Sequence, residues 1–142
     1  HTRFLDGLEF YKQYFEAANI LGATILVLHG QNNCGRYGGI EEADYLEKYL
    51  ALYELGQQFG ITVAQENVNG FRSANPAFIR RMREQLQNRC AFVFDVKQAV
   101  RAGFDPYDMC DAMGKNLIHM HINDLHRIVY CRETERWIIH VY

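Results

Sequence analysis

The stretch Lys-Asn-Leu-Ile-His-Met-His-Ile-Asn-Asp at residues 115–124 decides how the rest of the chain is interpreted. It predicts a β-strand, whose side chains alternate between the two faces of a sheet. One face would carry Leu117, His119, His121 and Asn123. The other face would carry Ile118, Met120 and Ile122. Two imidazoles on one face at the end of an apolar strand make that face a candidate functional site.

Three earlier apolar runs also end in a group that can bind a metal ion or transfer a proton. The runs at 24–28, 61–65 and 90–94 are followed by His29, Glu66 and Asp95, respectively. Apolar runs without alternation are typical of parallel strands that are covered on both faces. If the strands lie side by side, their ends bring these polar groups together.

Helical patterns separate the predicted strands, at 4–19 and at about 40–58. We expect the second of these helices to turn Ala43, Leu46, Leu50 and Tyr53 inward. Asn75-Pro76 and Asp105-Pro106 each predict a helix start, with an N-cap followed by proline. Residues 31–39 predict a long loop rich in turn residues.

Regular alternation of helices and strands predicts an α/β fold with a parallel sheet and outer helices. An open doubly wound sheet and part of a (β/α)8 barrel both fit, and both place functional groups at the carboxyl ends of the strands. The sequence contains neither a G-x-G-x-x-G nor a P-loop motif, which disfavours a nucleotide-binding open sheet.

Composition excludes several classes of protein. The 142 residues are 49% hydrophobic and 23% charged, as in one folded globular domain. A net charge of −2 without a basic stripe gives no reason to expect nucleic acid, and no apolar run is long enough to cross a membrane. The four cysteines form no C-x-x-C pair, so we expect free thiols and a cytoplasmic protein.

Each polar residue at a strand end has an ordinary structural explanation. Such a histidine is often only hydrogen-bonded, and such a carboxylate is often the N-cap of the next helix. The coincidence on successive strands favours a shared site instead, with Glu66, Asp95 and His121 as metal ligands. Two carboxylates and an imidazole suit Mn²⁺, our first choice, with Mg²⁺, Co²⁺ and Zn²⁺ as alternatives.

Four segments at 21–30, 63–67, 92–99 and 119–124 together resemble the xylose isomerase-like TIM-barrel superfamily. That group includes sugar phosphate isomerases and epimerases and the endonuclease IV-type enzymes. The resemblance implies that residues 1–124 are a partial barrel comprising about the third to sixth strands. It also implies that the chain is a fragment, inactive by itself and prone to associate, and that the full-length form is a homo-oligomer.

The resemblance implies roles by position. Glu66, Asp95 and His121 match three of four metal ligands, and Glu66 also matches a catalytic base. The fourth ligand, a glutamate on the eighth strand, has no counterpart. Substrate contacts would come from His29, Asn67, Gln98 and His119. The implied reaction is the isomerisation or epimerisation of a small sugar or sugar phosphate through a metal-stabilised cis-enediolate.

Three alternatives remain open from the sequence. The first is a dehydratase of a keto-polyol or a dehydroshikimate-type acid with the same fold. The second is a zinc-dependent endonuclease for abasic DNA, which is disfavoured because Gln98 stands where the superfamily often has a histidine. The third is a non-catalytic fragment.

The resemblance to this superfamily also implies that residues 125–142 are an aberrant tail. Related enzymes often continue with Leu-Pro-Gly-x-Gly-x-x-Asp, a motif that the tail does not contain. Codons 130–137 read one base out of phase permit that motif, and the genetic code forces its first and last residues. We therefore expect a frameshift, which the nucleotide sequence of these codons tests directly.

Overall fold

The computed structural model describes residues 2–31, 40–122, 126–131 and 136–141. Nearly all of the predicted loop at 31–39 therefore lies outside the described residues. The helices are α1 (Thr2–Ile20), α2 (Glu42–Gln58), α3 (Pro76–Leu86), α4 (Val96–Arg101) and α5 (Pro106–Met113). The strands are β1 (Ile25–Leu28), β2 (Thr62–Glu66), β3 (Ala91–Asp95), β4 (Leu117–His121), β5 (His126–Cys131) and β6 (Arg136–Val141).

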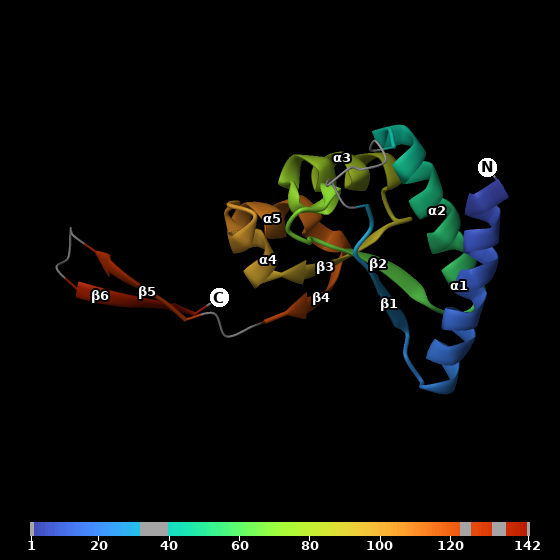
Figure 1. The fold of residues 1–142 in the computed structure, drawn as a ribbon, viewed down its shortest axis with the longest axis horizontal. Helices are drawn as coiled ribbons and strands as arrows, with labels where there is room; N and C mark the ends of the chain where they lie inside the picture. The colour runs from blue at the N-terminus through green and yellow to red at the C-terminus, as the bar shows by residue number, and fades with distance from the viewer. Residues whose placement is uncertain (1, 32–39, 123–125, 132–135, 142) are drawn as a thin grey trace.

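The first four strands form one sheet in the order β1-β2-β3-β4, and every neighbouring pair is parallel. Figure 1 shows the helices gathered on one side of this sheet, with β1 and β4 at its two edges. The predicted α/β architecture with a parallel sheet and outer helices is confirmed. All four strand carboxyl ends therefore lie at the same rim.

The main core lies between the sheet and the helices. Val63, Phe92 and Phe94 point into it and pack with residues of α3 such as Ile79 and Met82. A smaller cluster lies on the opposite face, where Ala64, Ala91 and Val93 pack with Ile25 and Tyr53. Because side chains alternate along a strand, Glu66 and Asp95 belong to this opposite face.

Both predicted N-caps are confirmed. The Asn75 side chain accepts a hydrogen bond from the Ala77 N–H at 2.9 Å, and Asp105 accepts one from the Tyr107 N–H at 2.9 Å. The short helix α4 was missing from the sequence prediction. It begins directly after β3, with Asp95 as its N-cap.

The predicted buried face of α2 is confirmed at Leu46 and was wrong at Ala43, Leu50 and Tyr53. Its buried residues are Tyr45, Leu46, Tyr49, Leu52 and Gly56, whereas Ala43 is exposed and Leu50 and Tyr53 are only partly buried. Tyrosine can be buried here because its hydroxyl finds a partner. The Tyr49 hydroxyl donates to the Val63 carbonyl at 2.8 Å.

The predicted alternation along 115–124 also needs correction. Between Phe92 and Val93 the pairing of β3 with β4 shifts, so that Leu117 lies opposite Phe92 and His119 opposite Val93. Leu117 therefore packs against the main core, whereas His119 and His121 face the other side. A bulge of this kind changes which face a side chain joins. Asn123 lies outside the described residues.

Strands β5 and β6 pair antiparallel in a separate two-stranded sheet. This hairpin occupies the segment that we interpret as an aberrant tail, and the frameshift hypothesis stays a prediction. In the described part of the chain, every helix is too short or too polar to span a membrane.

Candidate metal centre

Glu66 is the centre of the site. It is the last residue of β2, which lies between β1 and β3, and only 5% of its surface is exposed. Its two carboxylate oxygens face different strands. Oε1 lies 2.7 Å from His121 Nδ1 on β4, and Oε2 lies 2.9 Å from His29 Nε2 after β1. One buried carboxylate thus joins groups from both edges of the sheet.

Asp95 ends β3 and has two roles in the structure. Its Oδ1 accepts the Gln98 N–H at 2.9 Å, which makes it the N-cap of α4. Its Oδ2 lies 3.9 Å from His121 Nδ1. Asp95 can therefore be both an N-cap and a candidate metal ligand, because Oδ1 serves the helix and Oδ2 faces the cluster.

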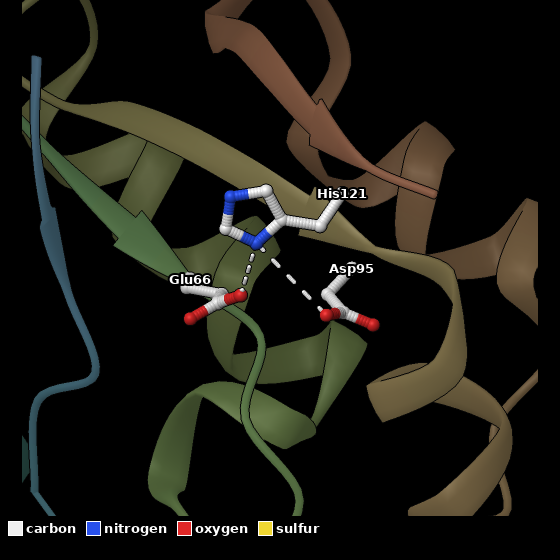
Figure 2. A group of neighbouring side chains, drawn as sticks. All are labelled: Glu66, Asp95 and His121. Atoms are coloured by element: carbon white, nitrogen blue, oxygen red, sulfur yellow. Dashed lines mark hydrogen bonds and ion pairs between the residues drawn. The ribbon is translucent and has the colours of Figure 1, made fainter. Parts of the chain in front are cut away.

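Figure 2 shows Glu66, Asp95 and His121 converging from three strands. One ligand atom of each lies within 4.8 Å of the other two. Atoms bound to a single ion lie up to about 4.4 Å apart, twice a bond of about 2.2 Å. Small side-chain rotations would therefore suffice to place all three on one divalent ion.

The electrostatics of the cluster also fit a cation. Glu66 and Asp95 are only 5% and 6% exposed, and like charges that share a buried site repel one another. A divalent cation between them would offset both the repulsion and the lost hydration. Carboxylate oxygens with one imidazole suit Mn²⁺, Mg²⁺ or Co²⁺, and Zn²⁺ also accepts this set.

His29 is held by contacts from β2 rather than by its own strand alone. The buried Gln65 amide donates to the carbonyls of Leu28 and His29, at 3.0 and 2.9 Å. Tyr45 in turn donates to Gln65 Oε1, and burial raises the pKa of this tyrosine above its ordinary value. The chain turns at Gly30 with φ of 81°, where a side chain would strike the Tyr45 hydroxyl.

The other predicted contact residues lie in different settings. Asn67 is fully buried, and its amide bonds both main-chain groups of Asp95. Gln98 is partly buried, and its Oε1 accepts the Asn69 N–H at 3.1 Å. His119 is exposed and meets the His121 ring edge-to-face at 5.3 Å between centroids. The structure thus places His29 and His119 beside the three candidate ligands, with Asn67 and Gln98 behind Asp95.

Sequence reasoning missed Gln65 and Tyr45. A signal was available, because a glutamine that interrupts an apolar strand must find hydrogen-bond partners once it is buried. Those partners are carbonyls of the neighbouring strand end, which a sequence does not show.

The chain matches the family model described as "Xylose isomerase-like TIM barrel" over residues 2–133. No curated protein matches it.

Several solved structures share the fold. The probable 3-DHS dehydratase AsbF of Bacillus anthracis is 17% identical, with a TM-score of 0.73 over 87% of this chain and 46% of that one. A D-tagatose 3-epimerase-like protein is 18% identical, with a TM-score of 0.65 over 84% of this chain and 48% of that one. A xylose isomerase domain protein of Planctomyces limnophilus is 14% identical, with a TM-score of 0.63 over 92% of this chain and 46% of that one.

The chain therefore spans a little less than half the length of these structures. Its four parallel strands, its outer helices and the matched residues agree. On this evidence the chain belongs to the xylose isomerase-like TIM-barrel family.

Proposed function

We propose that this chain is the metal-binding part of a sugar or sugar phosphate isomerase or epimerase, and that Mn²⁺ is its preferred ion. The observation that supports this most directly is the convergence of Glu66, Asp95 and His121 at the carboxyl rim of a parallel sheet. Functional groups of barrel enzymes lie at this rim. An epimerase-like protein and a probable dehydratase share the fold, so the fold alone does not tell which reaction this site would catalyse.

The residues present can perform the first half of such a reaction. A divalent ion held by the three side chains would supply the positive charge that stabilises an enediolate. Glu66 then serves as the base that takes a carbon-bound proton of a ketose. Its Oε1 faces His121, which leaves Oε2 for the proton, 2.9 Å from His29 Nε2. His29 is largely exposed and can pass that proton on to solvent.

A single base limits what this chain alone can do in an epimerisation. One carboxylate can remove and return a proton on one side of the sugar only. Inversion of that carbon needs a second group on the other side, which we assign to a segment outside this chain. In an epimerisation the chain by itself should therefore exchange the proton without changing the sugar, whereas an isomerisation moves the proton between neighbouring carbons on one side and needs only one base.

Deuterium exchange tests this proposal. The chain is incubated with Mn²⁺ and D-fructose or D-fructose 6-phosphate in D₂O, and NMR follows deuterium at the carbon next to the carbonyl. We expect slow Mn²⁺-dependent incorporation that disappears in Glu66→Gln and persists in Glu54→Gln, an exposed control on α2. Absence of Mn²⁺ binding, or exchange that does not need Glu66, would contradict the proposal.

A dehydratase is the second candidate, and the fold shared with the probable 3-DHS dehydratase of Bacillus anthracis favours it. The same base and the same ion would serve, but the enediolate would expel a hydroxyl group instead of regaining a proton. Loss of water from a hydroxy-ketone conjugates its carbonyl and produces ultraviolet absorbance. Absorbance that grows with Mn²⁺ and depends on Glu66 would select this candidate over the isomerase.

A further inference from the structure

Asn67 occupies an unusual position next to the metal cluster. It follows Glu66 directly, where the main chain leaves β2, and it has no exposed surface. Main-chain pairing of β2 with β3 stops where Glu66 lies opposite Val93. Asp95 lies two residues further along β3, beyond the last pair of this register.

The Asn67 side chain continues the pairing at this point. Its Oδ1 accepts the Asp95 N–H at 2.7 Å, and its Nδ2 donates to the Asp95 carbonyl at 2.9 Å. An amide that bonds both main-chain groups of one residue fixes that residue in position and in rotation. We name this pair of hydrogen bonds the Asn67 clasp.

The clasp acts together with the helix cap on the same residue. The Gln98 N–H holds Asp95 Oδ1 at 2.9 Å, so Asp95 is tied at its main chain and at one carboxylate oxygen. The other oxygen, Oδ2, points at His121. Asp95 therefore presents one oxygen to the cluster before any ion arrives, which lowers the cost of ordering that ligand.

We propose that Asn67 is a positioning residue of the metal site, which sets Asp95 in register with Glu66, rather than a group that touches the sugar. Both polar atoms of the Asn67 side chain, Oδ1 and Nδ2, form hydrogen bonds with the Asp95 main chain, and the residue has no exposed surface. Residues behind a ligand commonly change metal affinity by about 10- to 100-fold when they are removed. The inference rests on the metal site proposed above.

The chain supplies a matched control in Asn116. This asparagine is also buried, and its amide also bonds main-chain carbonyls, including that of Cys90 at 2.8 Å. Cys90 directly precedes β3, so this second amide acts at the amino end of the strand whose carboxyl end Asn67 holds. Removal of either amide leaves buried main-chain groups unpaired and lowers stability. Only removal of Asn67 should change the metal site.

The experiment compares Mn²⁺ binding by the wild-type chain, Asn67→Ala and Asn116→Ala, with titration calorimetry for affinity and thermal unfolding for stability. We expect both variants to lower Tm. The Kd for Mn²⁺ should rise about 10- to 100-fold in Asn67→Ala and stay within about twofold of wild type in Asn116→Ala. Equal Kd values in wild type and Asn67→Ala would overturn the inference and leave the metal site standing. A wild-type chain that binds no Mn²⁺ would overturn the metal site and the clasp together.

A second variant and a second measurement cover the case in which Asn67→Ala does not fold. Asn67→Ser keeps a small polar side chain, but its single, shorter hydroxyl cannot replace both bonds of the amide to the Asp95 main chain, so it should weaken Mn²⁺ binding as well. Amide hydrogen exchange on the metal-free wild-type chain gives an independent result. The clasp requires the Asp95 N–H to be protected like the amides inside β3, and fast exchange would contradict it.

Discussion

The two central strands and the two edge strands of the sheet all contain apolar residues, but their surroundings are very different. In β3 every residue is buried, and Phe92 and Val93 have no exposed surface. In β4 Ile118 and Met120 are each 44% exposed, and in β1 Val27 is 38% exposed. Apolar composition alone therefore does not bury a strand, because burial here also needs a neighbouring strand on each side.

The candidate metal cluster shows the same difference. Its carboxylates come from the central strands, where the side chains of Glu66 and Asp95 are 6% and 8% exposed. Its imidazoles come from the edges, where His121 and His29 are 37% and 62% exposed. The centre of the sheet holds the two carboxylates in place, while the edges bring more exposed imidazoles, of which His121 is the candidate ligand.

The largest expected effect is at the centre of the sheet. Glu66→Gln removes the carboxylate that both imidazoles face, so Mn²⁺ affinity should fall by more than about 100-fold, since even residues behind a ligand often account for 10- to 100-fold. Titration calorimetry measures it, with Glu54→Gln as the exposed control. Retained Mn²⁺ affinity in Glu66→Gln would refute the assignment of Glu66 as a ligand.

The two edges can be compared with each other. His121→Ala should weaken Mn²⁺ binding about 10- to 100-fold, because His121 is one of the three converging ligands. His29→Ala should change the Kd less than about threefold, a loss of binding free energy under about 1 kcal/mol. The reason is that His29 faces Oε2 of Glu66, whereas His121 faces Oε1. The same titration measures both variants. A larger loss in His29→Ala than in His121→Ala would place the ion on the β1 side of Glu66.

A third prediction concerns the apolar surface at the β4 edge. Ile118, Met120 and Ile122 are exposed on and just after β4, which is an edge strand in the described part of the sheet, and such edges promote association. We expect the wild-type chain to run above its monomer mass of 16.6 kDa in light-scattering chromatography. Ile122→Lys should shift it toward the monomer, whereas Tyr107→Lys, an exposed site on α5, should not. A monodisperse wild-type monomer would contradict the prediction.

The smallest expected effect on the metal is at Gln98. Its side-chain Oε1 accepts the Asn69 N–H of the loop after β2 at 3.1 Å. Gln98→Ala should therefore leave the Kd for Mn²⁺ within about twofold of the wild-type value, because the main-chain N–H at position 98 still donates to Asp95 Oδ1. If Gln98 contacts the sugar, half-maximal deuterium exchange should need more ketose. A large loss of Mn²⁺ affinity would instead make Gln98 part of the metal site.

Much of the fold and part of the site could be predicted from the sequence, because the signals were local. Apolar runs predicted the parallel strands, and Asn75-Pro76 and Asp105-Pro106 predicted two helix starts. A rule about strand ends was enough to select Glu66, Asp95 and His121, since parallel strands bring their carboxyl ends to one rim.

Only the tertiary structure decided how those residues are held. The bulge that separates Leu117 from His119 depends on pairing with β3, and the inward turn of Tyr45 depends on Gln65 from another element. The Asn67 clasp likewise joins residues 28 positions apart in the chain. A sequence shows which polar groups must find partners when they are buried, but the choice of partner depends on which strands the fold places side by side.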